Sequence, residues 1–209
     1  LRSRMQDLIR REIAHAQAGD GGHIQAKMNA LTDPSLIALL YEASQAGVHI
    51  ELIVRGMCSL RPGVEGISDH IQVVSVIGQF LEHSRLFWFS NAGEPDLFIG
   101  SADWMPRNLD RRVEAVVPVL DPSLCIQLEW LMQLYLDDPQ AWLMQADGTY
   151  MVRNPEAEGP LAQRELMELW SLRSAPGEAP ARLASAPAAA ATAAARPARK
   201  PGGSRRRGR

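Results

Sequence analysis

Hydrophobic and polar residues alternate with two different periods along the first quarter of the chain. Segment 5–19 has apolar residues at helical spacing, whereas 23–29 alternates between apolar and polar residues as strands do. Segment 33–47 begins with Asp-Pro, a helix cap followed by a first-turn proline, and ends with the glycine typical of a helix terminus. The β-branched apolar run at 48–54 then indicates a buried strand. A strand, a helix and a strand in this order predict a parallel pair.

The same patterns continue along the folded part. A long loop at 55–70 precedes four more strand-like segments, at 71–77, 85–90, 97–101 and 112–120. An amphipathic helix starting at Pro122, a hairpin with its turn at Asp147-Gly148, and a last helix follow. Five or six strands with helices between them predict an α/β fold with a mixed sheet flanked by helices.

Charge divides the 209 residues into two unequal parts. Residues 1–172 carry 13 basic and 23 acidic residues, a formal charge of −10, whereas 173–209 carry nine basic residues and one acidic residue. The second part is rich in Ala, Pro and Arg and has no apolar pattern that would form a core. We therefore expect a domain at 1–158, a closing helix at 159–172 and a disordered basic tail at 173–209.

Composition excludes several classes of protein. Two cysteines without paired spacing, and no signal peptide, favour a reduced, cytoplasmic protein without a zinc or other metal site. No apolar run approaches the roughly 20 residues of a membrane span, and neither a Walker loop nor a GxGxxG motif occurs. The chain begins with Leu1 instead of Met, which suggests a fragment of a longer protein.

Positive charge in the folded part gathers between positions 55 and 112. The residues concerned are all arginines: Arg55, Arg61, Arg85, Arg107, Arg111 and Arg112. A guanidinium group matches phosphate oxygens with two parallel donors and stays charged at any relevant pH. Arg55 and Arg61 flank a loop at the carboxyl end of a predicted strand, where α/β sheets place ligands. The arrangement predicts a phosphate-binding groove; the alternative is that each arginine pairs with a surface carboxylate.

One histidine lies among these arginines. A strand starting at His83 would place its side chain on the same face as Arg85, where we expect it to act as a base or as a nucleophile toward phosphorus. The strand at 97–101 ends in Gly-Ser-x-Asp, so that Gly100 permits close backbone approach, and Ser101 and Asp103 are candidates to orient the imidazole. The alternative for His83 is a polar residue at a strand edge.

The remaining histidines and the tryptophan beside the turn are predicted to have no role in the site. His15, His23, His49 and His70 lack such neighbours and are predicted to be structural or surface residues. A nucleobase would stack on an exposed Trp104, but a tryptophan beside a turn is more often part of the core, and we predict a core position.

Long motifs carry a resemblance to a known family. The segments "KMNALTDP", "VRGMCSLRPG", "FLEHSR" and "GSADWMPRNLDRRVE" resemble the C-terminal catalytic region of polyphosphate kinase, the ATP-dependent enzyme that makes and degrades inorganic polyphosphate. The likeness covers about residues 5–155 and implies a phospholipase-D-like half-domain. It also implies ATP contacts at Arg55 and His83; Arg61, Arg85 and Arg107 are added from the charge argument, as binders of ATP or polyphosphate.

The resemblance further implies that half of the active site lies elsewhere. In the family, the phosphorylated histidine and the arginines that contact Mg²⁺ belong to a preceding half-domain, which this chain lacks. ATP, Mg²⁺ and inorganic polyphosphate are thus implied ligands, with no Mg²⁺ ligand expected here. We expect one wall of a phosphotransferase site, inactive alone, that forms homo-oligomers or associates with the missing half.

Two other functions remain open at this point. A dimeric phospholipase-D-like phosphodiesterase or nuclease would use one histidine from each copy, although Arg85 stands where that family has lysine. Alternatively, the chain is a binding module without chemistry, in which the basic tail makes weak contacts to nucleic acid or polyphosphate.

Overall fold

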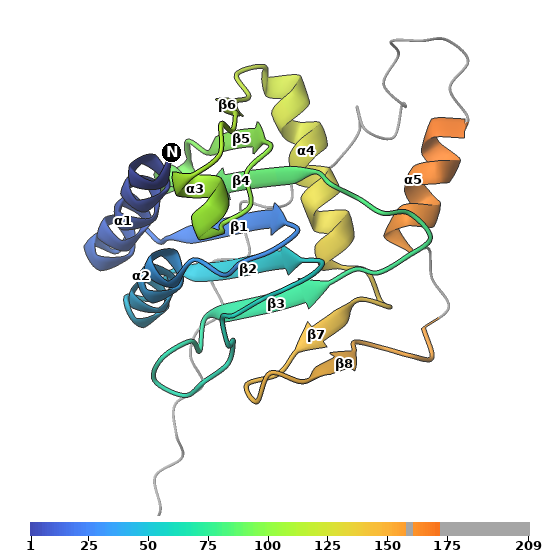
Figure 1. The fold of residues 1–209 in the computed structure, drawn as a ribbon, viewed down its shortest axis with the longest axis horizontal. Helices are drawn as coiled ribbons and strands as arrows, with labels where there is room; N and C mark the ends of the chain where they lie inside the picture. Colours follow the sequence, from blue (N-terminus) through green and yellow to red (C-terminus); the bar gives the residue numbers. More distant parts are fainter. Residues whose placement is uncertain (158–160, 172–209) are drawn as a thin grey trace, which may run out of the picture.

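The computed structural model describes residues 1–157 and 161–171, in which eight strands form a single sheet (Figure 1). The strands are β1 (His23–Met28), β2 (His49–Val54), β3 (Ile71–Ser75), β4 (Arg85–Phe89), β5 (Asp96–Gly100), β6 (Val116–Pro118), β7 (Trp142–Met144) and β8 (Tyr150–Val152). The helices are α1 (Arg2–Ala18), α2 (Pro34–Gln45), α3 (Pro106–Asp110), α4 (Pro122–Leu136) and α5 (Ala162–Ser171), with a 3₁₀ turn η1 (Asn91–Gly93). The predicted tail lies outside the described residues. No described helix has the length and apolar content needed to cross a membrane.

The sheet has a parallel centre and antiparallel edges. Its strand order is β6-β5-β4-β1-β2-β3-β7-β8, in which β1, β2 and β3 are parallel and each outer strand runs antiparallel to its inner neighbour. The predicted parallel pair is confirmed, with His23 opposite His49. The mixed α/β sheet is confirmed as well; the predicted hairpin supplies β7 and β8, which brings the described strands to eight.

Helices cover both faces of the sheet. On one face, α1 and α2 lie side by side (Figure 1). Their buried residues share one core with alternate strand residues such as Ile50 and Leu52. On the other face, α4 and α5 contribute Met132 and Ala162 to a second core that includes Ile53. Because successive strand residues point to opposite faces, one strand supplies both cores. The polar side chains of β1 and β2 also lie on the second face, beside α4.

Two elements near the edge differ from the prediction. The expected strand at 112–120 is only three residues long, because β6 is the sheet edge and pairs with Phe98, Ile99 and Gly100 of β5 alone. A side chain added at Gly100 would lie 2.7 Å from the carbonyl oxygen of Ala115, so the close approach that this glycine permits is that of the neighbouring chain segment. Helix α3 was not predicted, because five residues are too few to show a helical period.

The N-terminus of α2 is held by Asp33, whose side chain is only 1% exposed. Its Oδ1 accepts hydrogen bonds from the backbone N–H groups of Ser35 and Leu36 at 3.1 and 3.0 Å, and from Nη1 of Arg2 at 2.6 Å. Burial raises the pKa of Asp33, but the hydrogen bonds from Arg2, Ser35 and Leu36 outweigh it and keep the pKa below its ordinary value. This stabilisation is therefore present above the unfolded-state pKa of about 3.9 and is lost as the pH falls through the folded-state pKa.

We expect Asp33→Ala to lower the free energy of unfolding by about 2–3 kcal/mol, because it removes a cap and leaves Arg2 without its buried partner. Asp121 is the matched control, since it caps α4 in the same Asp-Pro-Ser sequence but is exposed. Asp121→Ala should cost about 1 kcal/mol. Urea denaturation at neutral pH measures both losses, and near about pH 3 the difference should shrink. Equal losses at neutral pH would contradict the role of the ion pair.

Candidate functional site

Three strand ends meet at one edge of the sheet. Asn29 follows β1 and Arg55 follows β2, so both lie at the carboxyl ends of parallel strands. Arg85 opens β4, which runs antiparallel to β1, and this direction brings the start of β4 beside the end of β1. The topology thus gathers residues that are far apart in the sequence, at the edge where α/β sheets place ligands.

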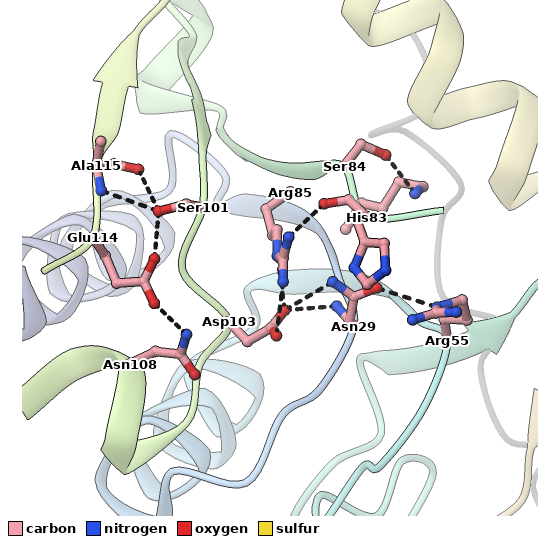
Figure 2. Close-up of polar contacts among 11 residues, drawn as sticks. Asn29, Arg55, His83, Ser84, Arg85, Ser101, Asp103, Asn108, Glu114 and Ala115 are labelled. Atoms are coloured by element: carbon pink, nitrogen blue, oxygen red, sulfur yellow. Dashed lines mark hydrogen bonds and ion pairs between the residues drawn. The ribbon is translucent and has the colours of Figure 1, made fainter. Parts of the chain in front are cut away.

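The carboxylate of Asp103 joins these strand ends. Asp103 is only 5% exposed and follows β5. It accepts hydrogen bonds from Nε and Nη2 of Arg85, at 3.1 and 3.2 Å, and from the backbone N–H of Asn29 at 2.8 Å. The side-chain oxygen of Asn29 in turn accepts a 3.1 Å hydrogen bond from Nε of Arg55 (Figure 2). Two guanidinium groups from separate strands are therefore oriented through one buried carboxylate and one amide.

Lys27, near the end of β1, adds a third cation to the two arginines. Its ammonium donates to the hydroxyl of Ser84 at 2.7 Å and pairs with Glu82 at 3.1 Å. Burial lowers the pKa of Lys27, the carboxylate of Glu82 opposes that effect, and the nearby charges of Arg55 and Arg85 lower the pKa further. Lys27 is the register partner of Leu86, the residue after Arg85, and Asn29, which binds Arg55, follows Lys27 by two positions. The three cations therefore belong to the same group of strand ends. Lys27, Arg55 and Arg85 are called the basic cluster below.

Side chains from the helical layer pin the loop that leads to β4. Glu82 accepts a hydrogen bond from the hydroxyl of Tyr135 in α4, and burial together with this carboxylate raises the pKa of Tyr135 well above its ordinary value. Gln163 in α5 binds both backbone groups of Phe80 at 2.9 Å and donates to Glu82 at 3.0 Å. Hydrogen bonds from α4 and α5 thus anchor the loop at Phe80 and Glu82, just before His83.

His83 lies in this loop, two residues ahead of β4. The prediction that His83 begins an alternating strand together with Arg85 is wrong, because the strand starts at Arg85 itself. Instead, Nη1 of Arg85 donates a 2.7 Å hydrogen bond to the backbone carbonyl of His83. In Figure 2, the exposed His83 imidazole points into the space between the Arg85 and Arg55 side chains.

The Gly-Ser-x-Asp turn separates into two parts. Asp103 belongs to the network around the basic cluster, as described above. Ser101 faces the other way: its hydroxyl donates to Glu114 and accepts from the backbone N–H of Ala115 at 3.1 Å. The hydrogen bond from Ser101 lowers the pKa of Glu114. Ser101 therefore supports the segment that leads into β6. Asp103 orients Arg85 and Asn29, and not the His83 imidazole as predicted.

The remaining predicted residues lie outside the basic cluster. Nε of Arg61 is 3.9 Å from the position that a side chain at Gly148 would occupy, so this guanidinium lies beside the turn between β7 and β8. Arg107 is exposed on α3. Trp104 is 1% exposed and stacks on Phe87 with ring centroids 5.4 Å apart, which confirms its predicted place in the core.

Two members of the site were missed by the sequence analysis. Neither Lys27 nor Asn29 was assigned a role from the sequence. The available signal was their position at the carboxyl end of the first parallel strand, which is the argument that singled out Arg55 at the end of the second.

The chemistry of the basic cluster suits an anion. Both nearby carboxylates are already engaged, Asp103 by Arg85 and Asn29, and Glu82 by Lys27 and Tyr135. The site therefore does not fit Mg²⁺, which requires free oxygen ligands. Two half-buried guanidinium groups with donors left over do fit phosphate oxygens.

Comparisons with known proteins agree on one family. The family model for polyphosphate kinase C-terminal domain 2 matches residues 1–163. Polyphosphate kinase of Parasynechococcus marenigrum is 61% identical over 174 residues, which cover 82% of this chain and 24% of that protein. Polyphosphate kinase of Pseudomonas aeruginosa is 51% identical over 156 residues, 74% of this chain and 23% of that protein. The crystal structure of polyphosphate kinase from Porphyromonas gingivalis matches with a TM-score of 0.77 and 38% identity, over 82% of this chain and 26% of that one. The chain thus spans about a quarter of the length of these relatives.

We expect Asp103→Ala to lower the free energy of unfolding by about 3 kcal/mol, because it leaves the Arg85 guanidinium and the Asn29 N–H without their buried acceptor. Asp96→Ala is the matched control. Asp96 pairs with Arg11 but its side chain is 38% exposed, so its loss should cost no more than about 1 kcal/mol. Urea denaturation of the two variants at neutral pH compares the losses. A smaller loss for Asp103→Ala than for Asp96→Ala would rule out its central role.

Proposed function

Since the chain belongs to the family of polyphosphate kinase C-terminal domain 2, we propose that it forms one wall of a site that transfers phosphoryl groups between ATP and inorganic polyphosphate. The observation that supports this proposal is the convergence of Arg55 and Arg85 through Asn29 and Asp103. Phosphoryl transfer depends mainly on positioning and on neutralising oxygen charge, which preoriented guanidinium groups supply.

In this proposal, the basic cluster holds the phosphate oxygens, and the His83 imidazole between Arg85 and Arg55 contacts them as well. Nε of Arg55 is bonded to Asn29, which fixes the plane of the guanidinium and leaves its terminal nitrogens as donors. Arg85 is held through Nε and Nη2 by Asp103 and through Nη1 by the carbonyl of His83, and Lys27 adds positive charge. The exposed imidazole of His83 donates a hydrogen bond to the same phosphate chain or accepts one from it.

The residue that carries the phosphoryl group belongs, in this proposal, to another part of the family protein. The described site offers a single imidazole, and its two carboxylates are engaged by Lys27, Arg85 and Asn29. A wall of this kind binds nucleotide or polyphosphate without turning it over. Mg²⁺ would be held by groups outside this cluster, for the reason given above.

We expect Arg55→Ala to weaken polyphosphate binding to the isolated chain about tenfold, the loss typical of one charge-assisted hydrogen bond. Arg4→Ala is the matched control, since Arg4 is exposed on α1 and its loss removes the same charge away from the cluster. Calorimetric titration with polyphosphate of defined length, at constant salt, measures both affinities. Equal weakening by the two variants would mean that net charge, and not the cluster, holds the chain.

The isolated chain should bind polyphosphate and make none from ATP and Mg²⁺, because the proposal assigns the group that receives the phosphoryl to another part of the family protein. A product assay for polyphosphate checks this, and synthesis by the chain alone would refute the proposal of a single wall. The same titration with a chain ending at residue 172 separates binding by the cluster from binding by the basic tail. If binding disappears with the tail, the chain is better explained as a binding module without chemistry.

A phosphodiesterase assay tests the other alternative. Hydrolysis of a phosphodiester by a dimer of this chain, lost in His83→Ala, would favour that function.

A further inference from the structure

A second group of polar side chains lies at the opposite end of the same two strands. His23 opens β1 and His49 opens β2, and the two residues are direct partners in the parallel register. Glu51 follows His49 by two positions, so its side chain projects from the same face of the sheet. Neighbouring strands are about 4.8 Å apart. The fold therefore brings two imidazoles and one carboxylate together on a rigid surface, far along the strands from the basic cluster.

Both imidazoles are directed at the same carboxylate. Nε2 of His23 lies 2.9 Å from Oε2 of Glu51, and Nε2 of His49 lies 3.7 Å from Oε1. One nitrogen or oxygen atom from each of the three residues lies within 4.8 Å of the other two. Ligand atoms around a tetrahedral zinc ion are about 3.3 Å apart, given bonds of 2.0–2.1 Å. The two nitrogen–oxygen distances, 2.9 and 3.7 Å, lie on either side of this spacing.

Neighbouring residues orient Glu51 and His23, as the residues around the ligands of a metal site do. Nε2 of Gln25 donates a 2.8 Å hydrogen bond to Oε2 of Glu51, which fixes the plane of the carboxylate. The indole of Trp88 packs edge-on against the His23 ring at 5.1 Å, and its own N–H donates to Glu129. These contacts orient Glu51 and His23, and the more exposed His49 ring lies beside the His23 ring, with centroids 5.0 Å apart.

We propose that His23, His49 and Glu51 bind one divalent cation of the zinc class, with a fourth position open to water. Two imidazole nitrogens favour zinc and its late first-row neighbours over Mg²⁺ or Ca²⁺, which prefer oxygen ligands. Access is provided for, because the side chains of His49 and His23 are 55% and 31% exposed. The folded part is also acidic, with ten more acidic than basic residues in 1–172, which favours any cation.

This site is independent of the proposed phosphoryl transfer, since its residues lie at the other end of β1 and β2. A bound ion would link the first residues of two neighbouring strands. A ligand that binds the folded state and not the unfolded state raises the unfolding temperature, so the ion should stabilise the protein.

Zn²⁺ titrated into the full chain by calorimetry should bind at one site per chain. His49→Gln and Glu51→Gln should each weaken that binding about 100-fold, since a lost ligand costs at least as much as a lost outer-shell partner. His83→Gln is the matched control: it removes another exposed histidine at the far end of the sheet and should leave the Zn²⁺ affinity unchanged. Because His49 is exposed, His49→Gln should keep the fold, which circular dichroism verifies.

Co²⁺ used in place of Zn²⁺ supplies a spectroscopic signal. We expect a visible absorption band of four- or five-coordinate Co²⁺, quenching of Trp88 fluorescence that Trp88→Phe removes, and loss of both signals in His49→Gln. No saturable Zn²⁺ binding by the wild-type chain would overturn the proposal and leave a hydrogen-bonded His-Glu-His group. Equal affinity in the wild type and His49→Gln, or equal weakening by His83→Gln, would overturn it as well.

Discussion

The buried carboxylate of Asp103 is the interaction on which the geometry of the basic cluster depends. It binds the side chain of Arg85 and the backbone of Asn29, and through the Asn29 amide it orients Arg55. A half-buried guanidinium group needs an acceptor that offsets its lost hydration. Asp103 is that acceptor for Arg85, the Asn29 side chain is that for Arg55, and Asp103 also connects β5 to the end of β1 and the start of β4.

The parallel arrangement of β1 and β2 separates two kinds of polar chemistry on one sheet. The carboxyl ends of these strands lead to Asn29 and Arg55, while their first residues are His23 and His49. Cations therefore gather at one edge and imidazoles with a carboxylate at the other, on strands whose remaining residues are mostly buried. A sheet that is packed on both faces gives both groups a rigid support.

The position of a residue along the fold was predictable from sequence where a strand end was the signal, whereas the direction of its side chain was not. Arg55 does follow the predicted strand at 48–54, and Asp103 does follow the predicted strand at 97–101. Arg61 lies in the loop that starts at Arg55, but its side chain lies near Gly148, and the Ser101 hydroxyl binds Glu114. Such directions depend on the partner that each side chain finds across the fold, and spacing along the chain does not contain that information.

By itself, the sequence determined the elements whose signals are local: the Asp-Pro cap of α2, the parallel pair β1 and β2, and the core position of Trp104. Only the tertiary structure decided which polar groups meet. The hydrogen bonds from Arg55 to Asn29 and from Asn29 to Asp103 join residues 26 and 74 positions apart, and His23 meets Glu51 across 28 positions. Contacts at such separations follow from strand order and register, which arise from packing both faces of the whole sheet and leave no trace in a short stretch of sequence.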